Sequence, residues 1–164
     1  MEFEISTADS LKITDQELSE LLKQVYVEGG FTSPEEAILL FETGTVRQRG
    51  LLIGAREKLH STLAGIVILV PPDSHARRLA GNNEAEIHLL GVKPAYRQHG
   101  LGRKLVEAAI ERAKQSGYSK IILWTQFSMK AAQQLYASTG FIYTKDMARN
   151  GREFKVYEKQ LIVI

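Results

Sequence analysis

The sequence predicts an α/β fold, a single domain over residues 1–164 with a mixed sheet of about seven strands flanked by about four helices. Strand-like alternating apolar runs are interspersed with helix-like runs, in the order β-α-α-β-β-β-α-β-α-β-β. Residues 84–125 contain a strand, a helix and a strand, and such a crossover makes its two strands parallel neighbours. A chain of 164 residues with 44% hydrophobic side chains is long enough for one sizeable core.

The chain begins with a predicted strand and a predicted helix. Residues 3–8 (FEISTA) are typical of a short strand. Residues 15–27 predict a helix because their apolar side chains share one side, and the pair Gly29-Gly30 ends it. The apolar side chains are Leu18, Leu21, Leu22 and Val25.

A second helix is predicted to begin at Ser33. Serine is a good N-cap, Pro34 suits the first helical position, and acidic residues follow in the first turn. We expect this helix to stop near Gly44. Its apolar residues are Ala37, Ile38, Leu40 and Phe41.

The remaining elements follow the same strand and helix periodicities of apolar residues. Residues 50–57 and 62–70 predict two neighbouring strands of a hairpin-like pair, and residues 71–83 a polar loop that is mobile or faces a substrate. Apolar residues recur every four positions from about Gly100 to Ser116, which predicts a helix. The other predicted elements are strands at 85–92 and 120–125, a helix between Ser128 and Gly140, and final strands at 141–146 and 154–164 joined by a turn containing Asn150-Gly151.

Charge is unevenly distributed along the chain. Residues 1–82 carry 8 basic and 12 acidic side chains, a formal charge of −4, whereas residues 83–164 carry 13 and 7, a formal charge of +6. The second half therefore favours an anionic ligand, although a solvated basic face would have the same composition. No DNA- or RNA-binding signature occurs there and the aromatic residues are not interleaved with the cations, so we expect no nucleic-acid partner.

Cysteine is absent, which removes disulfides, thiolate metal sites and a cysteine nucleophile, and fits a reducing compartment. The histidines are scattered, so we expect no metal. No apolar run reaches the length of a membrane span, and the acidic start MEFEISTADS does not fit a secretory signal. We expect a cytoplasmic protein with no membrane partner, and a homodimer is left open.

The segment VKPAYRQHGLGRKLV, residues 92–106, places two glycines and several cations where a strand turns into a helix. A helix N-terminus presents unpaired backbone N–H groups, and glycines let a ligand approach them. The turn from Gln98 to Arg103 therefore forms a cup of amides suited to a diphosphate, to which Arg97 and Lys104 can add charge. A tight turn that binds nothing is the alternative.

Two other diphosphate-binding signatures fail at this turn. The Walker pattern needs Gly-Lys-Ser/Thr, but Arg103, Lys104 and Leu105 follow Gly102. The dinucleotide fingerprint needs a third glycine, and Arg103 occupies that position. No G-x-S-x-G nucleophile elbow occurs in the chain.

The pattern V-x-P-x-x-R-x-x-G-x-G, from Val92 to Gly102, resembles the acetyl-CoA signature of GNAT-type N-acetyltransferases, whose pyrophosphate loop is R/Q-x-x-G-x-G/A. The segment AAQQLYASTGF (131–141) resembles the family's second signature, an alanine followed by a Leu-Tyr pair and a Gly-Phe pair. The resemblance covers residues 84–141 in motif and nearly the whole chain in element order. It implies the acyl-CoA N-acyltransferase fold and transfer of an acetyl group from acetyl-CoA, the co-substrate, to a primary amine by direct attack in a ternary complex.

The resemblance also assigns a cofactor site to this turn and the strand before it. Backbone amides from Leu90 to Val92 would receive the thioester and pantetheine, where the strand splays from its neighbour, and Gly91 is consistent with a bulge there. Met129 replaces the asparagine that many members have seven residues before the tyrosine, and either lines the pantetheine channel or fills core. The full set of expected cofactor-binding residues is Leu90, Gly91, Val92, Arg97, Gln98, His99, Gly100, Leu101, Gly102 and Arg103.

Two catalytic residues follow from the resemblance. Tyr136 would lie near the sulfur of CoA as general acid. Glu86, eleven residues before the loop, occupies the position of the general base in some members. His88 and water are the alternatives, and a histidine pKa of about 6.5 suits proton transfer at neutral pH. On a strand without a bulge, Glu86 and His88 would share one face with Glu84, Leu90 and Val92.

The acceptor is left open between a small molecule and a protein amine. Arginines in the segments that would select it hint at an acceptor that also carries a carboxylate or phosphate, and these are Arg77, Arg78, Arg149 and Arg152. A non-catalytic acyl-CoA-binding sensor or interaction module is the alternative function, since it would keep the loop and lose the proton chemistry.

Overall fold

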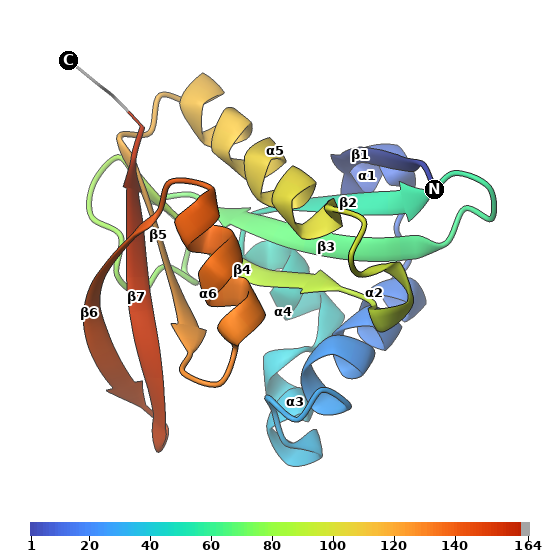
Figure 1. Cartoon of the computed structure of the whole chain (residues 1–164), viewed down its shortest axis with the longest axis horizontal. Helices are drawn as coiled ribbons and strands as arrows, with labels where there is room; N and C mark the ends of the chain where they lie inside the picture. Colours follow the sequence, from blue (N-terminus) through green and yellow to red (C-terminus); the bar gives the residue numbers. More distant parts are fainter. Residues whose placement is uncertain (162–164) are drawn as a thin grey trace.

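The computed structural model describes residues 1–161 and contains a seven-stranded mixed sheet in the order β1-β2-β3-β4-β5-β7-β6 (Figure 1). Among the described strands only β4 and β5 pair in parallel, and the other pairings are antiparallel. The predicted fold class and the predicted crossover are therefore confirmed. The strands are β1 (Phe3–Thr7), β2 (Leu51–Glu57), β3 (Leu63–Val70), β4 (Glu84–Val92), β5 (Lys120–Gln126), β6 (Ile142–Arg149) and β7 (Arg152–Gln160).

Helices cover both faces of the sheet. Apolar side chains of α5 and α6 pack on one face, and those of α1, α2 and α4 pack on the other. Figure 1 shows α5 crossing one face of β2 and β3. The α-helices are α1 (Ala8–Leu11), α2 (Asp15–Leu22), α3 (Pro34–Leu40), α4 (Thr43–Gln48), α5 (Leu101–Gln115) and α6 (Lys130–Ser138), with a π-helical turn at Lys23–Val27 and a 3-10 turn at Pro94–Tyr96.

The predicted helix over residues 15–27 is confirmed, as α2 and the π-helical turn that continues it. Thr14 and Glu17 form a capping box at its start, which satisfies backbone N–H groups that have no partner inside the helix. The predicted apolar side is buried, with Leu18, Leu21 and Leu22 fully inaccessible.

The predicted second helix is split in two. Its start is confirmed by a capping box between Ser33 and Glu36, but Phe41 leaves the helical conformation and Glu42 then caps α4 through the N–H groups of Gly44 and Thr45. The expected stop at Gly44 is wrong, because this glycine lies inside α4. Helix α3 buries none of its residues, and Ile38 is 75% exposed.

Strands β4 and β5 pair over three residues and then diverge, as Figure 1 shows. The register between β3 and β4 shifts by one residue between Ile66 and Ile68, and Leu89 has a φ of +53°, which marks a β-bulge in β4. Side chains beyond the bulge change face, so Leu90 packs with Ile87 on the α5 side. Glu86 and His88 therefore do not share a face with Leu90 and Val92, as the sequence predicted only for a strand without a bulge.

The C-terminal hairpin of β6 and β7 is confirmed. Asn150 and Gly151 form its turn with φ angles of +52° and +74°, which asparagine and glycine tolerate best. Both strands extend closer to the turn than the sequence predicted. The last three residues of the predicted final strand, 162–164, lie outside the described residues. In residues 1–161 no helix has the length and apolar character needed to cross a membrane.

Candidate active site

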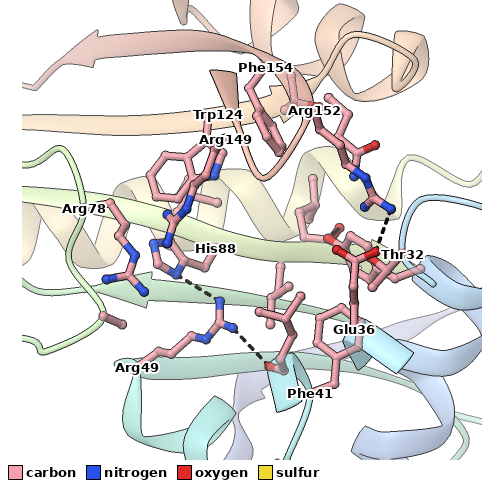
Figure 2. Close-up of a pocket in the computed structure, with 18 of the residues that line it drawn as sticks. Thr32, Glu36, Phe41, Arg49, Arg78, His88, Trp124, Arg149, Arg152 and Phe154 are labelled. Atoms are coloured by element: carbon pink, nitrogen blue, oxygen red, sulfur yellow. Dashed lines mark hydrogen bonds and ion pairs between the residues drawn. The ribbon is translucent and has the colours of Figure 1, made fainter. Parts of the chain in front are cut away.

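A cavity of about 490 Å³ lies where β4 and β5 diverge (Figure 2). Its walls come from α3, α4, β4, β5 and α6, from the loop between β3 and β4, and from the β6–β7 hairpin. Segments from both halves of the chain line this cavity, because they surround the opening between the two strands.

The turn before α5 forms the amide cup that the sequence predicted. No backbone or side-chain acceptor in residues 1–161 bonds the backbone N–H groups of residues 98–103, whereas the N–H of Lys104 donates to the Gly100 carbonyl at 3.2 Å. Gln98 and Gly100 have φ angles of +66° and +72°, which bend the chain so that successive N–H groups point outward. Such an arrangement at the start of a 15-residue helix can hold an anion.

Two arginine side chains of this turn are engaged within the protein. Arg97 Nε donates to the Val92 carbonyl at 3.2 Å. Arg103 bonds the Ser138 hydroxyl at 2.6 Å and lies 3.9 Å from Glu107. In residues 1–161 the Arg103 guanidinium is thus engaged and Arg97 is held through Nε alone, so the anion-binding groups that this turn presents are chiefly its main-chain N–H groups.

The backbone of β4 beyond the bulge has one edge without a strand partner. The Lys93 N–H donates to the Ala64 carbonyl at 2.9 Å, and in an antiparallel ladder every second residue bonds the same neighbour. The backbone groups of Leu90 and Val92 therefore point away from β3, toward the space that β5 has left. Side chains reach their carbonyls there, with Tyr26 bonding Leu90 O at 2.9 Å.

Gly91 allows close packing against a helix. A Cβ at this position would lie 3.3 Å from a methyl group of Val25 and 3.5 Å from one of Leu21. The glycine thus lets α2 approach the bulged strand. Leu90 lines the cavity, whereas Gly91 and Val92 do not.

Glu86 is fully buried and its carboxylate is saturated with hydrogen bonds. One oxygen, Oε2, accepts the backbone N–H groups of Arg78, Leu79 and Ala80 at 2.6 to 2.8 Å, and Oε1 lies 2.8 Å from His88 Nε2. Burial raises the pKa of Glu86, but these hydrogen bonds outweigh it and bring the pKa below its ordinary value. Glu86 is therefore ionised at neutral pH and does not line the cavity.

His88 lines the cavity and is held from both sides. An ionised Glu86 can only accept, so Nε2 carries the proton and Nδ1 presents its lone pair. Arg49 Nη1 lies 3.3 Å from Nδ1, as Figure 2 shows. Burial lowers the pKa of His88. The bond to Glu86 raises this pKa, and the positive charges of Arg49 and Arg78 lower it further. The net shift is downward, so the ring is neutral at neutral pH.

Tyr136 lies on α6, 5% exposed, between the rings of Phe141 and Tyr157. Its side chain reaches the cavity, and its hydroxyl has no hydrogen-bond partner among residues 1–161. Burial raises its pKa, which keeps the phenol protonated. Met129 lines the same wall and accepts a bond from the Thr125 hydroxyl at 3.3 Å.

The arginines predicted near an acceptor are only partly brought together. Arg78, Arg149 and Arg152 line the cavity and Arg77 does not. Sequence reasoning missed Arg49, which follows α4 and lies beside His88, because no motif marks its segment VRQRG. Among residues 1–161 no group of three or more metal-ligating side chains is assembled.

Known proteins resemble this chain in sequence. A model of the acetyltransferase (GNAT) family matches residues 16–141. Yeast (Saccharomyces cerevisiae) N-alpha-acetyltransferase 30 is 41% identical over 63 residues, which cover 38% of this chain and 36% of that protein. Escherichia coli L-amino acid N-acyltransferase MnaT is 28% identical over 103 residues, covering 57% of this chain and 60% of that protein. The chain thus spans less than two thirds of the length of each of these relatives.

Solved structures share the fold over nearly the whole chain. A GNAT-family acetyltransferase from Staphylococcus aureus Mu50 superposes with a TM-score of 0.76 at 18% identity, covering 98% of this chain and 100% of that one. The ribosomal-protein-S18-alanine N-acetyltransferase of Escherichia coli superposes with a TM-score of 0.72 at 19% identity, covering 99% and 96%. At these identities the similarity is one of fold.

The bonds to Glu86 predict a pH-dependent stability. Glu86→Gln should lower the free energy of unfolding at neutral pH by about 1–3 kcal/mol, because an amide cannot accept all the hydrogen bonds that the carboxylate accepts. The folded-state pKa of Glu86 lies below the unfolded value of 4.5, so this advantage of the wild type is complete above that pH and is lost as the pH falls through the folded value. Urea denaturation across this range measures it.

The control is Glu153→Gln, at an exposed glutamate that has no ion pair in residues 1–161. Its free energy of unfolding should match that of the wild type at each pH. Equal stability of wild type and Glu86→Gln at neutral pH would show that the carboxylate does not anchor the loop.

Proposed function

Because the chain belongs to the acetyltransferase (GNAT) family, we propose that it transfers the acetyl group of acetyl-CoA to a primary amine by direct attack in a ternary complex. One observation carries the proposal. The unbonded amides before α5, the open edge of β4 and the phenol of Tyr136 lie around one break in the sheet. The amides suit a diphosphate, the edge of β4 suits a thioester, and the phenol suits a leaving thiolate.

The cofactor contacts follow from the backbone. The N–H groups from Gln98 to Arg103 would hold the diphosphate of CoA. Pantetheine would then add to the free edge of β4, where the backbone groups of Leu90 and Val92 point away from β3. An N–H on this edge is the donor that we propose for the oxyanion formed on the thioester carbonyl.

The proton steps use three side chains. The amine nitrogen attacks the thioester carbon, the C–S bond breaks, and the thiolate takes the proton of the Tyr136 hydroxyl, which solvent restores. We propose that Nδ1 of His88, which faces the cavity, accepts the ammonium proton directly or through a water. Glu86, expected from sequence to be the base, then acts as a positioning residue because its carboxylate is buried behind His88 and fixes the imidazole tautomer.

The acceptor is not fixed by similarity. The names of the relatives specify different acceptors, including protein α-amines and L-amino acids. The alternative function, a sensor that binds acyl-CoA without turning it over, differs only in the proton chemistry, so turnover decides between the two.

The cofactor assignment predicts that Gly102→Glu abolishes CoA binding measured by calorimetry, because a carboxylate would occupy the amide cup. A Cβ at Gly102 would lie 3.1 Å from a Leu135 methyl group, a flexible contact that can adjust, and circular dichroism checks the fold. Arg103→Ala is the control, since that side chain is bonded to Ser138 and its removal should change the affinity little. Unchanged CoA affinity in a folded Gly102→Glu protein would remove the diphosphate from this turn.

The base assignment predicts that kcat/KM of the wild type stays high down to a pH below about 6.5, because the lowered pKa of His88 keeps the ring neutral there. His88→Gln should lower kcat by about 10²-fold or more at neutral pH and recover partly at alkaline pH, where the free amine is abundant. The measurement is a pH–rate profile of both proteins. Identical profiles would exclude His88 as the proton acceptor.

The acid assignment predicts that Tyr136→Phe lowers kcat by about 10²–10⁴-fold and leaves CoA affinity unchanged, because only a hydroxyl is lost. A screen of acetyl-CoA turnover across amine classes supplies the acceptor for this comparison. Wild-type kcat in the variant would make Tyr136 a packing residue. CoA binding without turnover of any amine would favour the sensor.

A further inference from the structure

Three arginines from separate elements converge beside His88 in the cavity, as Figure 2 shows. Arg49 follows α4, Arg78 lies in the loop between β3 and β4, and Arg149 ends β6. None of them has a carboxylate partner within 4.0 Å in the described part of the chain. Within residues 1–161 the Arg49 guanidinium bonds only the Leu40 carbonyl, at 3.1 Å, and His88 Nδ1.

Residues 1–161 supply the cavity with no free negative charge to offset this cluster. Among them Glu36 is the only acidic residue in the wall, and its carboxylate already pairs with Arg152 at 2.8 Å and caps α3. Burial lowers the pKa of Arg49. Tyr26 raises this pKa, and repulsion from Arg78 and Arg149 lowers it further. Like charges held together in this way gain most from a bound oxyanion.

The diphosphate of CoA does not account for the cluster. None of residues 97–103 lines the cavity, so the amide cup lies outside the space that the arginines share. The cup also has its own unbonded N–H groups. A second anion is therefore expected, on the side of the cavity that contains His88.

The cluster lies close to where the amine would react. Arg49 Nη1 is 3.3 Å from His88 Nδ1, and Leu90, on the proposed thioester edge, is two residues farther along β4. Two residues of chain span at most about 7 Å, so an amine near Leu90 would be joined to an oxyanion beside His88 by only a few bonds. An oxyanion bound to Arg49 would compete with His88 Nδ1 for the Arg49 guanidinium. Binding of the oxyanion would therefore free Nδ1, the proposed base, to accept a proton.

Hydrogen bonds close one side of the cavity against a long chain. Arg152 of β7 bonds the Phe31 carbonyl and Glu36, and Gln126 of β5 bonds the same carbonyl at 2.8 Å. These contacts join the segment before α3 to the C-terminal hairpin. A closed side favours a small acceptor over an extended peptide.

We propose that the acceptor is a small amine that carries an oxyanion a few bonds from its nitrogen, held by Arg49, Arg78 and Arg149. This inference rests on the proposed transferase function for the identity of the ligand. The arginine site itself can be tested without turnover.

The first test compares matched acceptors. L-Leucine against L-leucinamide tests a carboxylate, and O-phosphoethanolamine against ethanolamine tests a phosphate. The neutral member of each pair holds more free amine at neutral pH, so intrinsic reactivity favours it. The wild type should nevertheless acetylate at least one anionic member with the higher kcat/KM, and the pair that shows this identifies the oxyanion.

Variants of the two exposed arginines supply the side-chain test. Arg78→Ala and Arg149→Ala should each lower kcat/KM for the preferred anionic acceptor by about tenfold or more and leave its neutral partner nearly unchanged. Arg77→Ala is the matched control, because Arg77 is an exposed neighbour that does not line the cavity, and it should change neither value. CoA calorimetry verifies that each variant is folded.

Trp124, the single tryptophan, gives a readout without catalysis. Its ring centroid lies 5.0 Å from that of His88, in the cavity wall, so its fluorescence should change when the anionic acceptor binds in the presence of CoA. The dissociation constant should rise by about tenfold in Arg149→Ala and stay constant in Arg77→Ala.

The outcomes separate the two proposals. Arginine-dependent binding at Trp124 with no acetyl transfer would support the anion site and contradict the transferase. Transfer with no preference in either pair and no effect of Arg78→Ala or Arg149→Ala would overturn the anion site and leave the transferase standing. Acetylation of peptide N-termini with no discrimination within either small pair would overturn the small acceptor.

Discussion

The departure of β4 from β5 is the constraint on which the rest of the structure depends. The strands pair over three residues, and the bulge at Leu89 then turns β4 away. A continuous parallel ladder would have used the backbone groups of Leu90 and Val92 internally and closed the sheet. The bulge leaves that edge without a strand partner and rotates the following side chains onto the α5 side. Glu86 and His88, before the bulge, stay on the other face. The cavity forms at the break between the two faces, since His88 lines it from one face and Leu90 and Tyr136 from the other.

The buried carboxylate of Glu86 connects this opening to its surroundings. Burying a charge is costly unless hydrogen bonds satisfy it, and here three backbone N–H groups and one imidazole do so. The same bonds fix the loop that contains Arg78 against β4 and set the tautomer of His88. One side chain thereby holds a loop at the cavity wall and orients the ring that we propose as the proton acceptor. The carboxylate of Glu86, at the position that the family resemblance gives to the general base, therefore has no access to the cavity.

The two anion sites that we propose differ in kind, and the amide cup before α5 lies outside the cavity that the arginines line. The turn before α5 uses main-chain N–H groups, while the arginines of the cavity use side chains. Main-chain donors need no long side chain to be ordered and so bind with little loss of entropy. Arginines suit planar or tetrahedral oxyanions because their donors form a rigid fork. The excess positive charge of residues 83–164 predicted an anionic ligand, yet Arg49 and Arg78 come from the negatively charged half.

The sequence by itself determined the seven strands, the crossover, the helix start at Ser33 and the amide cup, because each depends on periodicity or on chemistry within a few residues. The family resemblance pointed to Tyr136 and the β4 segment, and Tyr136 and Leu90 line the cavity. Only the tertiary structure decided that α3 and α4 are separate, that the bulge divides β4 into two faces, and that Glu86 is buried behind His88. It alone brought Arg49, Arg78 and Arg149 together, since they are separated by tens of residues and no local pattern records which distant side chains share a hollow.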